Sequence, residues 1–138
     1  MRIAYTYIEG KNLLVQQYSG QPNIKQYAAY LEHLKQQPFY EDVFLLLTDL
    51  THMDFEAVKA SVESVTNTRN QKVNKKFKEV LVVSSPSNTA FATLLKIAGS
   101  KNAQFALCST FEKAITTLGI DLTKTEVEEI LESKLKLV

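Results

Sequence analysis

The chain has 138 residues, of which 16 are Lys or Arg and 15 are Asp or Glu, so its formal net charge is +1 with both histidines neutral. This length predicts one domain over residues 1–138, and the near-neutral charge argues against a general attraction to nucleic acid or to an anionic membrane surface. The single cysteine, Cys108, excludes an internal disulfide, and the longest purely apolar run, residues 43–47, is far shorter than the roughly 20 residues of a membrane helix, so we expect a cytoplasmic protein.

The first third of the chain predicts a β-hairpin followed by a helix. Residues 3–8 and 12–18 are rich in Tyr, Ile, Leu and Val, which favours two strands joined by a tight turn. Asn23 and Gln26 form a candidate capping box for the next helix, which should end before Pro38, because the residue before a proline avoids the helical region. All six tyrosines lie in this part of the chain. We expect them to pack the helix against the hairpin, the alternative being an interface or the mouth of an apolar pocket.

The rest of the chain alternates apolar strands with helices. We expect core strands at 43–50, 79–83 and 103–108, the first of them covered on both faces because it is uniformly apolar. Four helices are expected to begin at capping residues, namely Asp54, Ser85 or Ser87, Ser109 and Thr123. Strands alternating with helices predict an α/β fold with a mixed sheet of four or five strands, in the order β-β-α-β-α-β-α-β-α. Residues 120–138 add a C-terminal helix that covers a sheet edge or face, acts as a lid or forms a dimer element.

A basic band lies between the second predicted helix and the strand at 79–83. It contains Arg69, Lys72, Lys75, Lys76 and Lys78. Phosphate binding is one reading of such a band, but its only aromatic residue is Phe77, whereas single-stranded nucleic acid is held by several stacked rings. We interpret the band as a solvated or protein-docking face and expect no nucleic-acid partner.

Four segments carry a resemblance to a known superfamily. They read YSGQPNIKQY, LLLTDLTHMDFEAV, KEVLVVSSPSNTAFATLL and FALCSTFEKAITTLG, and they lie within residues 1–119. This pattern resembles the STAS-like (SpoIIAA-like) superfamily, whose founding members are anti-sigma-factor antagonists. It is most similar to small bacterial STAS-like proteins that are also compared with lipid-binding CRAL-TRIO domains. The resemblance implies a SpoIIAA-like mixed sheet and a role in binding.

The chain departs from regulatory STAS domains at one position of their pattern. Those domains carry an Asp-Ser-Ser-Gly phosphoacceptor motif after the strand that corresponds to residues 43–50. Here residues 52–58 read HMDFEAV and contain no serine. A switch driven by a phosphoserine at this site is therefore not expected.

Polar side chains follow two neighbouring strands of the predicted sheet, where ligands of open α/β sheets bind. We predict a binding surface formed by Asp49, Thr51, His52, Asp54, Ser85, Ser87, Asn88 and Thr89. Asp49, His52 and Asp54 also have the donor atoms of a metal site or of an oriented general base, but we favour a turn acceptor, a solvated histidine and a helix cap, and predict no metal. The serine-rich helix start could hold an anion, yet it lacks a Gly-rich loop, so ordinary capping is favoured.

No pair of residues predicts a catalytic centre. Cys108 ends an apolar strand, which is typical of a small buried side chain, and neither His33 nor His52 is placed beside it by the sequence. We therefore predict a non-enzymatic STAS-like module without a cofactor, whose role is the regulatory binding of a protein partner. Two alternatives stay open, namely binding of a hydrophobic, lipid-like ligand or a membrane surface, and a small enzyme. A homodimer through an edge strand or the C-terminal helix also stays open.

Overall fold

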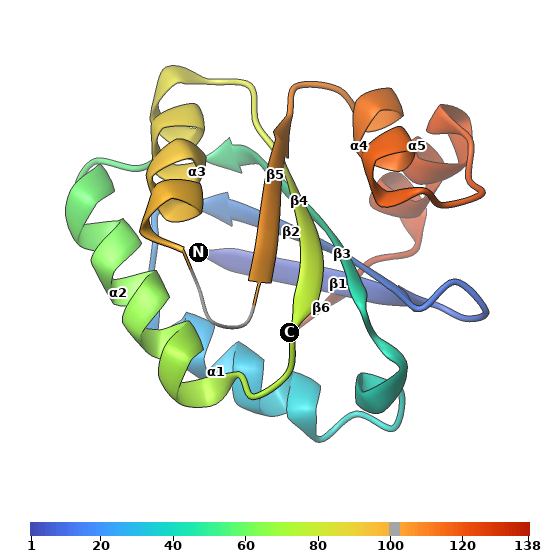
Figure 1. The fold of residues 1–138 in the computed structure, drawn as a ribbon, viewed down its shortest axis with the longest axis horizontal. Helices are drawn as coiled ribbons and strands as arrows, with labels where there is room; N and C mark the ends of the chain where they lie inside the picture. Colours follow the sequence, from blue (N-terminus) through green and yellow to red (C-terminus); the bar gives the residue numbers. More distant parts are fainter. Residues whose placement is uncertain (100–102) are drawn as a thin grey trace.

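One mixed sheet runs through the middle of the molecule, with helices on both of its faces (Figure 1). The structure is a computed structural model and describes residues 1–99 and 103–138. The six strands lie in the order β5-β4-β3-β2-β1-β6. In chain order the elements are β1 (Arg2–Ile8), β2 (Leu13–Gly20), α1 (Ile24–Lys35), the short 3-10 helix η1 (Tyr40–Asp42), β3 (Leu45–Met53), α2 (Val58–Lys72), β4 (Phe77–Val82), α3 (Pro86–Ala98), β5 (Ala103–Cys108), α4 (Phe111–Leu118), α5 (Lys124–Ser133) and β6 (Lys136–Leu137).

The sheet combines a parallel part with an antiparallel part. Strands β2, β3, β4 and β5 are parallel neighbours, whereas β1 is antiparallel to β2 and β6 is antiparallel to β1. β1 and β2 form the predicted hairpin, with Ile3 opposite Tyr18. The predicted α/β fold with a mixed sheet is confirmed, and β6 adds one more strand than expected. The strand at 103–108 has the predicted bounds but lies at an edge of the sheet, not in its core.

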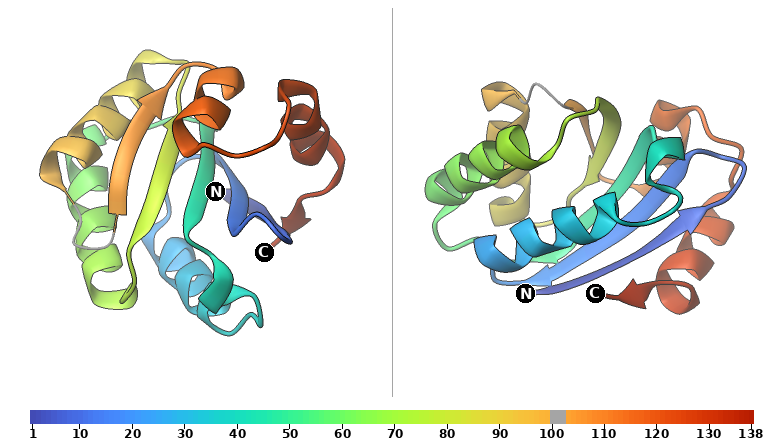
Figure 2. Two further views of the ribbon diagram at one scale, coloured as in Figure 1. Left: turned by 45° about the vertical axis from the view of Figure 1, so that its right-hand side comes forward. Right: turned by 90° about the horizontal axis from the view of Figure 1, so that it is seen from below.

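The two faces of the sheet carry separate apolar cores. Helices α1, α2 and α3 cover one face, and α4 and α5 cover the other (Figure 2). Because successive side chains of a strand point to opposite faces, β3 directs Leu46 and Leu50 into the first core and Leu47 into the second. Burial on both faces explains why this segment reads as an almost continuous apolar run.

Several helices begin where their capping residues predict. The side chain of Asn23 accepts a hydrogen bond from the backbone N–H of Gln26, although Gln26 turns its own amide to the Met1 carbonyl and leaves the capping box incomplete. Ser85 caps α3 in a reciprocal box with Asn88. Thr123 and Glu126 form the same arrangement at the start of α5. Each box satisfies N–H groups that have no partner within the helix.

Two predicted helix starts are wrong. Asp54 does not cap α2, because β3 stays paired with β2 as far as Met53 and the Asp54 N–H then bonds to the Gly20 carbonyl. The helix begins only at Val58. For α4 the cap is Thr110 in place of Ser109. For α2, the preceding strand extends further than its apolar run, which displaces the helix start. For α4, β5 ends at the predicted residue and the helix begins one residue after the expected position.

Residues 120–138 complete the second core and one edge of the sheet. Val127 and Ile130 of α5 are buried in that core. β6 then pairs with β1, with Leu137 opposite Ala4. The segment therefore covers both a face and an edge of the sheet. Among the described residues, no helix has both the length and the apolar character needed to cross a membrane.

Replacing Ile130 with alanine tests whether α5 is part of the packed structure. We expect Ile130→Ala to lower the free energy of unfolding by about 2–4 kcal/mol, because it opens a cavity in the second core. Glu129→Ala, at an exposed position of the same helix, should change it by less than about 0.5 kcal/mol. Urea denaturation measures both values. Equal effects of the two substitutions would contradict a packed role for α5.

Candidate functional site

A pocket of about 270 Å³ lies between the sheet and the helices of the first core. Most of its lining is apolar, contributed by Met1, Ile24, Leu50, Met53, Phe55, Val65, Leu81, Phe91 and Leu95. Polar side chains line it as well, among them Tyr18, Tyr27, Thr48, Arg69 and Glu79. The pocket lies on the face opposite α5, so residues 123–138 do not form the lid that was one of their expected roles.

Small side chains on α2 leave the space that the pocket occupies. Ala60, Ser61 and Ser64 line it from this helix, at positions where larger residues would fill the gap. Ala60 and Ser64 are exposed, as is Ile24 at the start of α1, so the pocket reaches the surface between these two helices. Its far wall is formed by Phe55 and Phe91, whose rings stack with their centroids 4.0 Å apart and an interplanar angle of 7°.

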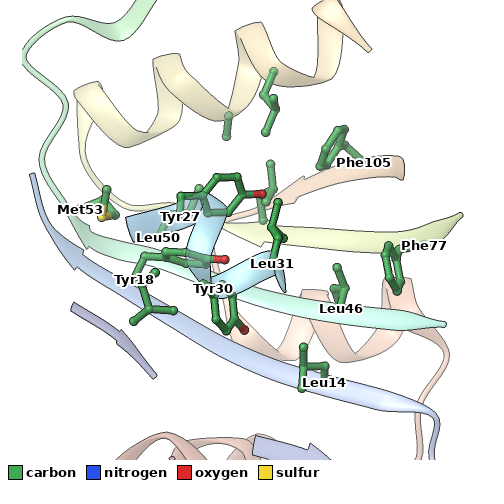
Figure 3. Close-up of a cluster of buried hydrophobic side chains, with 14 of the residues drawn as sticks. Leu14, Tyr18, Tyr27, Tyr30, Leu31, Leu46, Leu50, Met53, Phe77 and Phe105 are labelled. Carbon is green, nitrogen blue, oxygen red and sulfur yellow. The ribbon is translucent and has the colours of Figure 1, made fainter. Parts of the chain in front are cut away.

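Buried tyrosines border the pocket. Tyr18 of β2 lies with Tyr27 and Tyr30 of α1 above the sheet, beside the apolar side chains of the first core (Figure 3). The interpretation that tyrosines pack the first helix against the hairpin is therefore confirmed for these residues. Tyr18 and Tyr27 line the pocket at buried positions, away from its mouth. Burial raises the pKa of Tyr18, Tyr27 and Tyr30, so the three hydroxyls are neutral at physiological pH.

A chain of hydrogen bonds runs through the first core and reaches the floor of the pocket at Thr48 and Glu79. The Tyr30 hydroxyl donates to Gln16 Oε1 at 2.7 Å, and Gln16 Nε2 donates to Thr48 Oγ1 at 2.8 Å. The Thr48 hydroxyl in turn donates to Glu79 Oε2 at 2.7 Å. Gln16 and Thr48 lie opposite each other on β2 and β3, and Glu79 lies on β4. The strands thus place three polar side chains side by side in an otherwise apolar layer.

The chain ends in a buried ion pair. Glu79 Oε1 lies 3.0 Å from Arg69 Nη2, and Arg69 Nη1 donates to the Tyr27 hydroxyl at 3.2 Å. Arg69 also stacks over the Phe105 ring, with its guanidinium carbon 5.2 Å from the centroid. Only 4% of Arg69 and 2% of Glu79 are exposed. Burial lowers the pKa of Arg69, but Tyr27 and Glu79 outweigh this effect, so the pKa lies above that of a free arginine and the guanidinium stays charged.

The interpretation of the basic band as a solvated face is wrong for Arg69 and incomplete for two of its lysines. Because α2 continues as far as Lys72, Arg69 lies within the helix and on the same inward face as Val62 and Val65. Lys72 pairs with Glu32 at 3.3 Å. Lys75 donates to the Tyr40 carbonyl at 2.7 Å and lies over the rings of Tyr40, Phe44 and Phe77. These cations hold elements of the fold together.

The sequence contains a pattern that predicts the burial of Arg69, which the count of charges alone does not indicate. Val58, Val62 and Val65 follow the spacing of one helix face, and Arg69 is the next position on that face. A charge on an apolar helix face calls for a buried partner. Glu79 offers one, since it is the only charged residue of the apolar segment 79–83.

The residues predicted at the end of β3 do not form one cluster. Asp49 is 1% exposed and shares the sheet face of Leu47, opposite the pocket. Its carboxylate accepts hydrogen bonds from Gln17 Nε2 at 2.9 Å and from the Thr51 hydroxyl at 2.6 Å. His52 and Asp54 are exposed. Within residues 1–99 and 103–138, no three His, Cys, Asp or Glu side chains are grouped to hold a metal ion.

Two of the binding residues predicted after β4, Ser87 and Asn88, form hydrogen bonds with the backbone at and just after the end of β3. Asn88 is fully buried and donates to the Met53 carbonyl, while its Oδ1 accepts from the N–H groups of Ser84 and Ser85. Ser87 Oγ accepts from the Phe55 N–H. The N–H groups of Ser84, Ser85 and Asn88 are thus bound by side chains of the protein itself and are not available to an anion. Thr89 is exposed beside them.

The fold is similar to that of a solved protein, the anti-sigma factor antagonist from Mycobacterium paratuberculosis. The two align with a TM-score of 0.54 over 86% of this chain and 95% of that chain, at 16% sequence identity. No family model matches the sequence, and no curated protein is significantly similar to it. Likeness at this identity concerns the fold alone. The chain has the STAS-like (SpoIIAA-like) fold that the sequence resemblance implied.

The energetic role of the ion pair can be tested by removing first one charge and then both. Arg69→Met should lower the free energy of unfolding by about 3–5 kcal/mol, because it leaves the Glu79 carboxylate buried without its cation. The double variant Arg69→Met/Glu79→Gln should recover at least about 2 kcal/mol of this loss, since no charge then remains. Urea denaturation measures each value. A useful control is Lys72→Met, which removes only a solvent-accessible ion pair and should change the free energy of unfolding far less. If Arg69→Met costs no more than this control, the pair does not organise the core.

Proposed function

We propose that this protein is a non-enzymatic binding module that holds a small, mainly apolar ligand in the pocket between the sheet and helices α1, α2 and α3. The observation that carries the proposal is the pocket itself, which has the volume of about nine water molecules. Protein interiors are close-packed and leave few voids larger than one water. Sites for small molecules are concave and mainly apolar, with a few polar groups at fixed positions, and this pocket lies just below their usual lower volume of about 300 Å³.

The construction of the pocket favours a ligand over a packing defect. Its walls are held from several elements by the Phe55–Phe91 stack and by the hydrogen-bonded floor. Its mouth opens between α1 and α2, where the exposed Ala60 and Ser64 leave a passage. An apolar ligand that entered would remove its own surface from water, which contributes about 25 cal/mol per Å² of apolar area.

A second candidate function is the docking of a protein partner at the carboxyl end of the parallel strands. It is supported by the fold's likeness to an anti-sigma factor antagonist and by the exposure of His52, Asp54 and Thr89 at this edge. Thr51, Ser85 and Ser87 lie partly exposed beside them. This surface would serve the regulatory protein interaction that the sequence favours, and it adjoins the pocket wall at Phe55.

Ligand binding can be tested with toluene, which fits the apolar lining and has no polar head group. We expect saturable NMR shifts at Met53, Leu81 and Leu95 of the wild-type protein. Ser61→Leu should weaken binding at least ten-fold, because the larger side chain fills space within the pocket. Asn67→Leu, at an exposed position of α2 outside the pocket, is the matched control and should bind like the wild type. Shifts that never saturate, or that Ser61→Leu leaves unchanged, would count against the proposal.

Protein docking can be tested by affinity capture from the source cells. The wild-type protein should retain a partner that His52→Ala/Asp54→Ala loses, because these exposed side chains form the edge of the proposed surface. Glu129→Ala/Glu132→Ala, which alters exposed residues of α5 on the opposite face, should retain it. The same partners captured by all three proteins would exclude this edge as the docking surface.

A further inference from the structure

We propose that the pocket selects a neutral ligand whose head group both donates and accepts a hydrogen bond, such as an alcohol or a primary amide, over a carboxylate or phosphate with the same apolar chain. This inference rests on the proposed ligand-binding function and adds to it the chemical class of the head group. It follows from the charges on the pocket floor and from the hydrogen bonds that these groups have already made.

Charge balance on the floor disfavours an anionic ligand. Arg69 and Glu79 both line the pocket, and each is the counter-charge of the other at 3.0 Å. Arg69 is the only cationic side chain among the described residues of the lining. A carboxylate placed here would share that cation with Glu79, and the ion pair and the ligand together would then carry a net charge of −1. Burying an uncompensated charge is among the most costly changes a protein interior can undergo.

The hydrogen-bonding groups on the floor favour a head group that both donates and accepts a hydrogen bond. Glu79 Oε1 is buried and, although it is close to Arg69 Nη2, accepts no hydrogen bond in the described part of the chain. It can accept one from a ligand O–H or N–H. The Tyr27 hydroxyl accepts from Arg69, which leaves its own hydrogen to donate to a ligand oxygen. Both groups flank the same guanidinium, so one small head group can reach them together.

The Thr48 hydroxyl already makes two hydrogen bonds within the protein, so the ligand's head group contacts Glu79 and Tyr27. Thr48 also lines the pocket, but its hydroxyl accepts from Gln16 and donates to Glu79. The volume of about nine water molecules then limits the ligand to roughly ten non-hydrogen atoms. A straight-chain alcohol or amide of this size places its apolar part between Leu81, Leu95 and the phenylalanine stack.

Competition between 1-octanol and octanoate tests the inference on the wild-type protein. The two probes have eight carbons each and differ in head-group charge; the one additional alkyl carbon of 1-octanol accounts for only about four-fold in affinity. NMR titration at neutral pH should give a dissociation constant at least ten-fold lower for 1-octanol. Equal or tighter binding of octanoate would overturn the inference. If toluene binds while neither probe does, the inference fails and the proposed function stands; if toluene does not bind either, the proposed function itself fails.

A variant of Glu79 provides the reciprocal test. Glu79→Gln removes the negative charge while its amide oxygen can still accept from Thr48, so a bound anion no longer competes with the Glu79 carboxylate for the Arg69 cation. We expect the ratio of octanoate to 1-octanol affinity to rise at least ten-fold in this variant, and to stay unchanged in the matched control Glu63→Gln, an exposed position of α2. An unchanged ratio in Glu79→Gln overturns the inference. If this variant does not fold, the wild-type comparison alone decides.

Discussion

The buried pair of Arg69 and Glu79 determines how the larger core is arranged. Each charge has been removed from water and must be matched inside the protein. Their further partners, Thr48, Gln16 and Tyr27, lie on three other elements, so satisfying the pair fixes α1, α2 and the central strands relative to one another. The pocket persists for the same reason. Its floor cannot move into the void without breaking hydrogen bonds, and each buried group left unsatisfied costs about 1–3 kcal/mol.

The pocket and the carboxyl edge of the sheet share parts of their framework. Phe55 stacks on Phe91 in the pocket wall, and its backbone N–H bonds to Ser87 at the edge. Asn88 ties the start of α3 to Met53, another wall residue. A shift of the wall would therefore move the backbone that presents the exposed side chains of the edge. The two candidate functions are thus linked by covalent and hydrogen-bonded structure.

Sequence patterns predict the local structure well where one short-range effect dominates. The hairpin, the caps at Asn23 and Thr123, and the bounds of β5 follow from side-chain type and spacing within a few residues. The candidate site depends on contacts between distant segments. Asp49 was grouped with its sequence neighbours, yet the two-residue period of β3 places it on the face away from the pocket. Arg69 of α2 stands among lysines in the sequence, whereas its ion-pair partner Glu79 lies on β4.

The two edge strands of the sheet differ in length and in charge. On one side, β6 is only two residues long and carries Lys136, which blunts that border against further strands. On the other side, β5 offers six residues without a charge, and no further strand of the described chain pairs beyond it. Sheet continuation between two copies through β5 would pair the same edge strand of each copy and leave no β5 edge for a third. Such growth would stop at a closed two-fold pair and would not propagate into a fibre.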